Sequence, residues 1–379
     1  MKRVLFISHY AGTGGANLSM LYLILNLKSF GVEALVFIPK HGPIEEAFIK
    51  NGIKYEIHHY ASLRIADRGF LVNAFSTILR VAINTFQAVR LGFRLRKEID
   101  IIHSNSSLVF WGAFLKLFVR KPLVWHLREF GKGDYNLVFG LGRKLSAYCY
   151  AKADKVIAIS GAMNSFFKEN VYEGNNLITL YNGVDESTIV CKFNLAHQSS
   201  DGKAKIAIVG GISEAKNQED LILAVGLMGK LNYHVDIIGG GEEKYMIRLK
   251  QLVSENNLGD TVSFLGNKTN IGELLSDYDI GVITSKNEAF GRVTIEYMLA
   301  GLAVIGSRAG ANPEIIADGE NGLLYELGNH EDLAEKIASL VTDEAQRSRL
   351  AKNAYETAMQ NYTARINAKR VNDIYAKLV

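Results

Sequence analysis

Short apolar segments alternate with segments of helical periodicity through most of this chain. In the first half the apolar segments are RVLFIS (3–8), EALVFIP (33–39), IDIIHS (99–104), PLVWHL (122–127), KVIAIS (155–160) and LITLYN (177–182). The pattern breaks at residues 186–204 and restarts with KIAIVGG (205–211), HVDIIGGG (234–241), VSFLG (262–266), DIGVITS (279–285), AVIGS (303–307) and GLLYE (322–326). Short apolar strands joined by helices are typical of parallel sheets that helices cover on both faces. We therefore predict an α/β fold.

The break in this pattern predicts two domains, because 379 residues are too many for one compact core. We expect a doubly wound, Rossmann-like domain over residues 1–185, a linker over 186–204 and a second such domain over 205–355. A C-terminal helix over 356–379 is expected to pack back on the N-terminal domain. Domains of this kind that face each other bind ligands at the carboxyl ends of their strands, in a cleft.

The composition excludes several classes of protein. The apolar fraction of 48% and the charged fraction of 22% are those of a globular chain, not a disordered one. No apolar run is long enough for a membrane span, and the apolar run after Lys2 and Arg3 is too short for a signal peptide. Cys149 and Cys191 form no CxxC pair, which argues against a disulfide framework or a structural zinc site. We expect a cytoplasmic protein.

Positive charge is concentrated in the first half of the chain. Residues 1–185 hold 23 Lys and Arg against 13 Asp and Glu, whereas residues 186–379 hold 20 against 26. Segment 69–97 combines apolar residues at helical spacing with five basic ones: Arg80, Arg90, Arg94, Arg96 and Lys97. Two interpretations remain open: a basic amphipathic surface on an anionic membrane, at the inner face of the plasma membrane, or a core helix with a solvated face. Nucleic acid is not expected, since no basic stretch is interleaved with aromatic residues.

Two of the predicted strands lead directly into glycines, in GTGGAN (12–17) and VGGISEAKN (209–217). Glycine between a strand and a helix lets the backbone approach a phosphate at the helix N-terminus. Gly14 and Gly15 are therefore candidate ligand-binding residues, although a tight turn without a ligand is the alternative. A dinucleotide-binding site would also need an acid at the end of the second strand, where Lys40 follows instead.

The segment KNEAFGRVTIEYMLAG (286–301) places two carboxylates around a predicted helix start. The helix is expected to begin near Arg292 and to end at Gly301. Its first turn offers unpaired amides and a partial positive charge, which suit a diphosphate. Helical side chains lean toward the N-terminus, so Glu296 reaches that end and suits a ribose diol. Glu288, in the preceding loop, suits the hydroxyls of a sugar.

Carboxylates beside a diphosphate require cations, and the predicted topology brings Lys216 and Arg292 nearest. Charge-assisted hydrogen bonds of about 1.5–3 kcal/mol each would offset the repulsion. The alternative is that Glu288 is a solvated loop residue and that Glu296 is an ordinary acid near a helix start. The strand–loop–helix context and the neighbouring glycines favour a ligand site.

The extended segment KNEAFGRVTIEYMLAGLAVIGSRAGANPEII resembles the Glu-x7-Glu segment of retaining, GT-B-fold glycosyltransferases of family 4 (group 1), many of which build bacterial polysaccharides. Further resemblance lies in HSNSS, AISGAMNSFF, LYNGVD, VGGISEAKNQEDLI and GENGLLYELGNHEDLAEKI. It implies a GT-B fold and transfer of a sugar from a nucleoside-diphosphate donor to a hydroxyl acceptor, such as a lipid-linked glycan. It implies no cofactor, no metal and no covalent nucleophile, because the leaving diphosphate helps to deprotonate the acceptor.

The resemblance also implies roles for individual residues. Glu288 and His126 would contact the donor sugar, Lys216 the diphosphate and Glu296 the ribose. The remaining donor-binding residues would be the backbone amides of Phe290, Gly291, Arg292 and Val293, the glycines Gly14 and Gly15 that close over the phosphates, and Asn267 beside the base. By position alone, Arg128 and Glu129 are candidates for the acceptor side.

The chain departs from the family pattern at two positions. Gly211 stands where the family often has an arginine, and Asn17 stands where it has a glutamate. The first departure removes a phosphate cation, so a nucleotide-sugar-binding protein without turnover remains an alternative, as does a nucleotide-sugar epimerase of the same fold. Asp277 and Asp279 form an Asp-x-Asp pair, but they precede a strand at the sheet edge opposite the expected site. We therefore predict no metal there.

Overall fold

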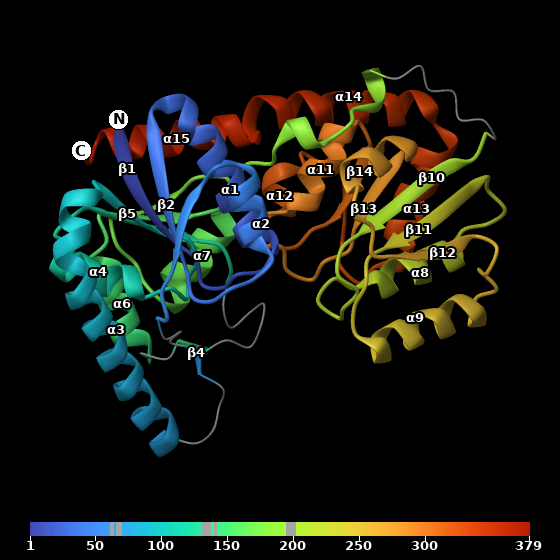
Figure 1. The fold of residues 1–379 in the computed structure, drawn as a ribbon. Coiled ribbons are helices and arrows are strands. Elements are labelled where there is room, and N and C mark those ends of the chain that lie inside the picture. Colours follow the sequence, from blue (N-terminus) through green and yellow to red (C-terminus); the bar gives the residue numbers. More distant parts are fainter. Residues whose placement is uncertain (61–63, 66–69, 131–137, 140–141, 195–201) are drawn as a thin grey trace. The chain divides into compact units, whose positions relative to one another are not determined.

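The computed structural model describes residues 1–60, 64–65, 70–130, 138–139, 142–194 and 202–379. The chain forms two compact units, one of Met1–Gly183 with Ala364–Val379 and one of Val184–Thr363 (Figure 1). Each unit is built on one parallel sheet covered by helices. The predicted α/β class with two doubly wound, Rossmann-like sheets is confirmed.

The sheet of unit 1 has the order β3-β2-β1-β5-β6-β8-β9, and all of its pairs are parallel. Its strands are β1 (Lys2–Ile7), β2 (Val32–Ile38), β3 (Lys54–Ile57), β5 (Ile101–Ser104), β6 (Leu123–Leu127), β8 (Lys155–Ala158) and β9 (Leu177–Thr179). The short strands β4 (Arg64–Ile65) and β7 (Val138–Phe139) pair separately and antiparallel. The helices of unit 1 are α1 (Gly15–Leu27), η1 (Lys28–Phe30), α2 (Ile44–Lys50), α3 (Phe70–Glu98), α4 (Trp111–Val119), α6 (Gly142–Ala151), α7 (Gly161–Asn170) and α15 (Ala364–Ala376).

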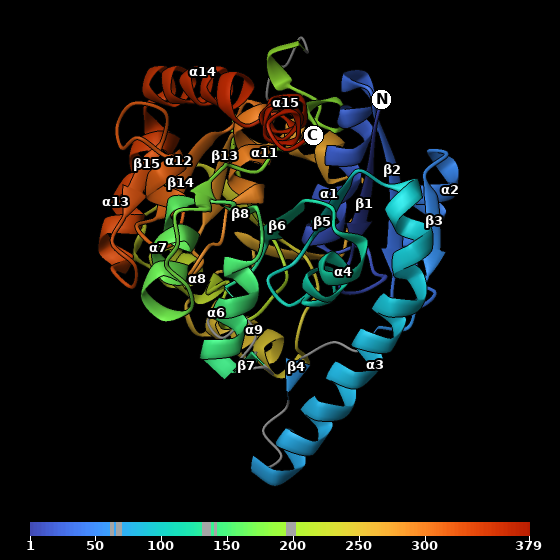
Figure 2. The same cartoon turned by 90° about the vertical axis from the view of Figure 1, so that its left-hand side faces the viewer.

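Helix α15 completes the core of unit 1, although it comes from the far end of the chain. Its buried residues Ala368, Val371 and Tyr375 belong to the same apolar cluster as Met20 and Ile24 of α1. The two helices lie against each other (Figure 2). The apolar face of α15 is therefore buried in unit 1, although the segment that precedes α15 in the sequence belongs to unit 2.

The sheet of unit 2 has the order β12-β11-β10-β13-β14-β15 and is also parallel. Its strands are β10 (Ala204–Val209), β11 (Tyr233–Ile238), β12 (Val262–Gly266), β13 (Ile280–Ile283), β14 (Ala303–Ser307) and β15 (Leu323–Tyr325). Its helices are η2 (Glu186–Thr188), η3 (Lys192–Asn194), α8 (Gln218–Leu227), α9 (Glu243–Glu255), α10 (Ile271–Leu274), η4 (Leu275–Asp277), α11 (Arg292–Ala300), α12 (Asn312–Ile315), α13 (His330–Thr342) and α14 (Glu344–Asn361).

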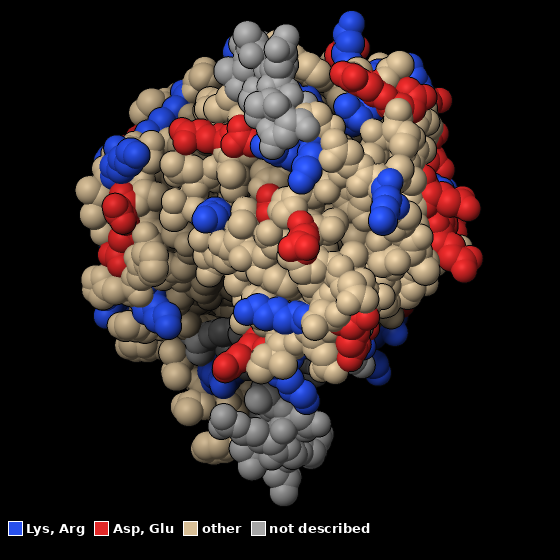
Figure 3. Space-filling model, turned by 90° about the vertical axis from the view of Figure 1, so that its right-hand side faces the viewer, with Lys and Arg blue, Asp and Glu red and all other residues tan. Residues whose placement is uncertain are grey.

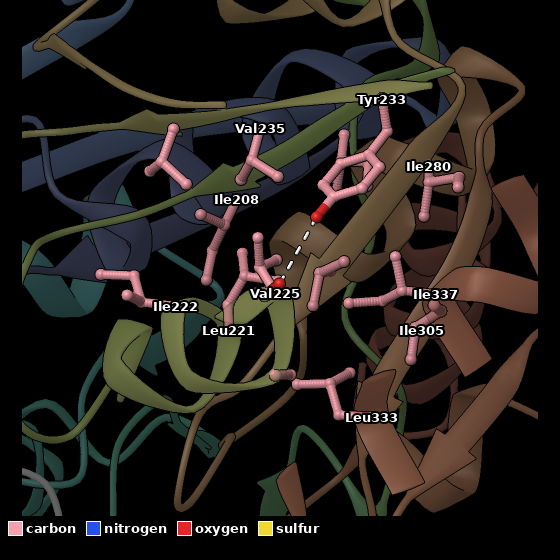
Figure 4. Packing of buried hydrophobic residues seen from close by; sticks show 14 of the residues in the cluster. Ile208, Leu221, Ile222, Val225, Tyr233, Val235, Ile280, Ile305, Leu333 and Ile337 are labelled. Atoms are coloured by element: carbon pink, nitrogen blue, oxygen red, sulfur yellow. Dashed lines mark hydrogen bonds between the residues drawn. The ribbon is translucent and has the colours of Figure 1, made fainter. Parts of the chain in front are cut away.

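The core of unit 2 explains why its strands are apolar throughout. Side chains of the central strands, such as Ile208, Val235 and Ile280, pack against Leu221 and Val225 of α8 (Figure 4). Burial of one such side chain contributes about 1.5–3 kcal/mol, and a sheet covered on both faces needs apolar residues at successive positions. This packing fixes the strand ends, and therefore the loops that follow them.

Candidate functional site

Strand β10 is the point at which the strand order of unit 2 reverses. The chain proceeds outward from β10 to β11 and β12, and then returns to β13 on the other side of β10. The loops that follow β10 and β13 therefore leave in different directions and open a crevice at the carboxyl edge of the sheet, where such folds bind ligands. They lead into α8 and α11 respectively.

Direct hydrogen bonds tie these two loops together at their bases. The backbone N–H of Lys286 donates to Ala215 O (2.9 Å), and the Thr284 hydroxyl donates to Lys216 O (2.8 Å). A small cavity lies between the loops. It is lined by Ile208, Val209, Lys216, Gln218, Val282, Ile283, Thr284, Ser285, Glu288 and Val293.

The N-terminal end of α11 is built for close approach by a ligand. Gly291 precedes the helix with a left-handed φ of 87°, and no side chain caps this end. A Cβ at Gly291 would lie 3.0 Å from Thr294 Oγ1 and 3.1 Å from Ile315 Cδ1, so only glycine fits without strain. The amides of the first turn and the helix dipole thus present a partial positive charge beside the cavity.

Lys216 and Glu288 meet at this cavity, as the predicted topology requires. Lys216 Nζ lies 2.7 Å from Glu288 Oε2, and the glutamate side chain is only 16% exposed. The backbone of Glu288 is held from its other side, because Ala311 N–H donates to Glu288 O (2.8 Å). Gly310 makes this approach possible: its φ is 57°, and a Cβ there would lie 2.3 Å from Glu288 N.

The second carboxylate is also paired. Arg292 Nε donates to Glu296 Oε1 at 2.7 Å, across one turn of α11, and both side chains are mostly buried. The sequence suggested Arg292 as a cation for phosphate, whereas in this structure it neutralises Glu296. The site therefore holds two ion pairs, Lys216–Glu288 at the loop and Arg292–Glu296 on the helix.

Tyr297 anchors α11 to the sheet. Its hydroxyl accepts a hydrogen bond from Val209 N–H (2.7 Å), and its ring fills the space above Gly281, where a Cβ would lie 2.2 Å from Tyr297 Cδ2. Burial raises the pKa of Tyr297, so the phenol is neutral. Sequence reasoning missed Tyr297, Gly281 and Gly310. The glycines stand in β13 and after β14, and a glycine at such a position is a signal of close backbone approach.

Asn267 follows β12, and its side chain lies against Gly240. A Cβ at Gly240 would be 2.7 Å from Asn267 Nδ2. This is the carboxyl edge of the same sheet. Gly211 lies nearby, with Gly240 O as the nearest atom to a Cβ at that position, at 3.9 Å. Gln218 Nε2 donates to Gly211 O (3.1 Å), so α8 secures the loop through its backbone.

In unit 1 the loop after β1 is closed by Asn17. Its amide donates to Tyr10 O (3.0 Å) and Gly12 O (2.8 Å), and its carbonyl oxygen accepts from the Ser8 hydroxyl (2.6 Å). Gly14 precedes α1, and Gly15 has open space around its Cβ direction. Asn17 thus has a structural role in this loop.

His126 lies at the carboxyl end of β6 and is fully buried. Its Nδ1 lies 3.2 Å from His103 Nε2, and His103 Nδ1 lies 2.6 Å from the Tyr375 hydroxyl of α15. Burial, and then the charge of Arg128, hold the pKa of both histidines well below the usual value. The imidazoles are neutral, and this chain of bonds couples their tautomers: when His103 carries its proton on Nε2, it donates to His126 Nδ1, and when it carries it on Nδ1, it accepts from His126 Nδ1–H. His126 Nε2 has no hydrogen-bond partner within the described chain.

Arg128 and Glu129 are also buried in unit 1. Arg128 Nε donates to Asn105 Oδ1 (3.0 Å) and its Nη1 to Asn182 Oδ1 (2.6 Å), while burial lowers its pKa to about 9. Glu129 accepts hydrogen bonds from Ser106 Oγ and from Ser107 N–H. These contacts brace the loops after β5 and β6, and an acceptor role for the two residues stays a prediction.

No group of three or more His, Cys, Asp or Glu that could hold a metal occurs in the described part of the chain. Asp279 accepts a hydrogen bond from Lys205 N–H (3.0 Å) and pairs with Lys192 (3.2 Å) at the start of β13. It therefore lies at the edge of the sheet opposite the cavity.

The two halves of the chain match two family models. Residues 13–188 match "Glycosyltransferase Family 4", and residues 193–357 match "Glycosyl transferases group 1". An uncharacterized glycosyltransferase of Methanocaldococcus jannaschii is 27% identical over 361 residues, which are 94% of this chain and 93% of that protein. The N,N'-diacetylbacillosaminyl-diphospho-undecaprenol alpha-1,3-N-acetylgalactosaminyltransferase of Campylobacter jejuni is 32% identical over 143 residues, 38% of this chain and 37% of that protein.

Among solved structures, Anabaena HepE in complex with UDP has the same fold, with a TM-score of 0.84 over 100% of both chains at 23% identity. The predicted GT-B fold is thereby confirmed. Matching models for both halves, glycosyltransferase relatives and this fold agree with one another. The chain belongs to the GT-B glycosyltransferases of family 4 and group 1 and is a transferase enzyme.

Proposed function

We propose that this enzyme is a retaining glycosyltransferase that moves a sugar from a nucleoside-diphosphate sugar to a hydroxyl of a lipid-linked glycan in surface polysaccharide synthesis, without a metal or cofactor. The observation that carries the proposal is the Lys216–Glu288 pair beside the uncapped N-terminus of α11. A cation, the amides of the first turn of α11 and a carboxylate are grouped there at one cavity. Such a group suits a diphosphate joined to a hydroxyl-bearing ring.

The donor is proposed to bind along the carboxyl edge of the unit 2 sheet. The amides from Phe290 to Val293 and the ammonium of Lys216 hold the diphosphate, while Glu296 accepts hydrogen bonds from the ribose diol. Asn267 lies beside the base. In unit 1, Gly14 and Gly15 at the start of α1 remain candidate phosphate-binding residues. Lys216 and Arg292 pair with the two carboxylates, which reduces the repulsion that an anionic ligand meets.

Catalysis is proposed to rest on positioning and on stabilisation of the leaving group. The bond between the anomeric carbon and the diphosphate oxygen breaks, and the acceptor oxygen bonds to the same face of that carbon. The acceptor proton passes to the departing diphosphate, whose new charge Lys216 and the α11 dipole stabilise. Glu288 orients the sugar hydroxyls. His126 Nε2, which lacks a partner within the described chain, is assigned to the sugar as well.

The lipid-linked acceptor is supported by a relative. The Campylobacter jejuni transferase carries a diphospho-undecaprenol acceptor in its name, and its similarity to this chain extends over 143 residues. We extend the acceptor class, and not the particular sugar, to this protein. Arg128 and Glu129 remain the candidates for acceptor contacts.

The test combines ligand binding with turnover. A thermal-shift panel of UDP, GDP, ADP and TDP and their sugar conjugates, with and without magnesium, identifies the base, because a ligand of the folded state stabilises by about 2.7 kcal/mol at a hundredfold excess over Kd. Glu288→Gln should then lose donor turnover without losing affinity for the free diphosphate. Glu214→Gln, an exposed carboxylate of the neighbouring loop, is the matched control and should change neither.

Other outcomes distinguish the alternatives. Binding without any turnover would indicate a nucleotide-sugar-binding protein, which the absence of an arginine at position 211 keeps open. Conversion of the donor sugar without an acceptor would indicate an epimerase. If Glu288→Gln leaves both binding and turnover unaltered, the assignment of the site is wrong.

A further inference from the structure

Helix α3 exposes a continuous row of large apolar side chains to solvent. The exposed fraction is 72% for Phe75, 67% for Phe86 and 76% for Phe93, and Ile78 and Leu79 are more than half exposed. With 3.6 residues per turn, these positions fall on one stripe along the helix. Ile83 and Val89 lie at the borders of that stripe and are also exposed. We call these seven residues the outer face of α3.

The outer face is not the side on which α3 packs. Asn84, Ala88, Leu91 and Leu95 are buried, and they lie on the opposite side of the helix, which contacts α4. The N-terminal half of α3 extends beyond the strands and helices of unit 1 (Figure 2). A helix at the surface of a globular unit needs only one apolar stripe, so a second stripe of phenylalanines marks an interaction surface.

Basic residues accompany the outer face. Helix α3 holds four arginines and one lysine against a single acidic residue, Glu98 at its C-terminal end, which pairs with Arg94 (3.5 Å). Arg94 pairs with Glu56 (2.7 Å) and Arg96 donates to Phe118 O (2.7 Å), whereas Arg90 and Lys97 are exposed beside the apolar stripe. On the face of the molecule seen in Figure 3, by contrast, acidic and basic side chains are interspersed.

We propose that the outer face of α3 docks on an anionic lipid bilayer, with its phenylalanines in the boundary between headgroups and acyl chains. Apolar residues flanked by basic ones are the chemistry of interfacial helices. No helix in the described residues is long and apolar enough to cross a bilayer, and an interfacial position needs no crossing. A second copy of the chain is a poorer occupant, because pairing two such faces would bring like charges together. The proposal does not depend on the donor chemistry.

The experiment is flotation of the full chain with vesicles of phosphatidylcholine alone and of equal parts phosphatidylcholine and phosphatidylglycerol. The wild type should float with the anionic vesicles, and less so at high salt. Phe86→Glu combined with Phe93→Glu should weaken binding about tenfold or more, and Arg90→Gln about fivefold. The control is Ile247→Glu, an exposed apolar residue of α9 in unit 2 (60% exposed), which should float like the wild type.

Circular dichroism and UDP binding should be the same for the wild type and all three variants, since none of Phe86, Phe93, Arg90 and Ile247 belongs to the donor site or to a buried cluster. Absence of flotation by the wild type overturns the proposal, as does equal flotation of the double variant. Sedimentation that reveals a dimer, which the double variant alone dissociates, would assign the face to self-association and also overturn it.

Discussion

Replacing Gly211 by arginine should tighten the binding of a nucleoside diphosphate. Gly211 occupies the position at which the family often has an arginine, and the structure has room for one. Its φ lies outside the left-handed region, and a Cβ would be 3.9 Å from its nearest neighbour, Gly240 O. The hydrogen bond from Gln218 reaches the Gly211 carbonyl oxygen and does not involve a side chain at this position.

The magnitude follows from the exposure of the site. A charge-assisted hydrogen bond contributes about 1.5–3 kcal/mol when it is shielded. Gly211 is exposed, so solvent screening reduces the expected gain to about 1 kcal/mol, which is about a fivefold decrease in Kd. The free energy of unfolding should change by no more than about 1 kcal/mol, because the backbone conformation suits a side chain.

The assay is isothermal titration calorimetry with UDP, or with whichever diphosphate stabilises the wild type most. The control is Gly229→Arg, which adds the same charge at an exposed glycine with nothing within 4 Å of its Cβ. That residue follows α8, about 15 Å along the helix from its N-terminal end. Only Gly211→Arg should bind more tightly, and its gain should shrink at high salt. An equal gain for the control, or no gain for a folded Gly211→Arg, would refute the reasoning.

Three further outcomes follow from the structure. Tyr375→Phe removes the hydroxyl that contacts His103; it should cost about 1 kcal/mol of stability and lower turnover without changing UDP affinity, both measurable on one preparation. Gly310→Ala should destabilise unit 2 by about 1–3 kcal/mol and reduce turnover, because its Cβ would displace Glu288; an active, stable variant would contradict this. The folded-state pKa values of His103 and His126 are depressed, so both histidines favour the folded state fully above about pH 6.5. Below that pH the free energy of unfolding should fall by up to about 2.7 kcal/mol per pH unit, because the unfolded chain binds two more protons. Urea unfolding between neutral and mildly acidic pH measures that slope.

The parts of the fold that depend on local pattern could be predicted from the sequence. Runs such as KIAIVGG and DIGVITS are too short for helices and too apolar for exposed strands, so buried parallel strands were the remaining assignment. The position of Glu288 after one such strand and of Lys216 after its neighbour then brought the two residues to one edge. Their 2.7 Å contact agrees with that topology.

Contacts between distant segments could not be predicted in this way. Tyr375 meets His103 across 272 positions, and Gly310 meets Glu288 across a strand and a helix, so neither pairing leaves a local pattern. Arg292 is a different case. Its spacing of four from Glu296 is the spacing of a helical ion pair, so this contact could have been predicted from the sequence. Arg292 was instead assigned to the phosphates of the expected ligand.

The two ion pairs, Lys216–Glu288 and Arg292–Glu296, also suggest how a site with two carboxylates binds an anion. Removing one partner of such an ion pair is costly, so a sugar donor that takes Lys216 away from Glu288 must supply a new partner for Glu288. A nucleotide sugar does so under the proposed function: its phosphate takes Lys216 while its sugar hydroxyls donate to Glu288. A free diphosphate offers the phosphate but no hydroxyls, and it leaves Glu288 without a partner. The intact donor should therefore bind more tightly than the product diphosphate in the wild type, and that preference should disappear in Glu288→Gln, whose neutral side chain needs no cation.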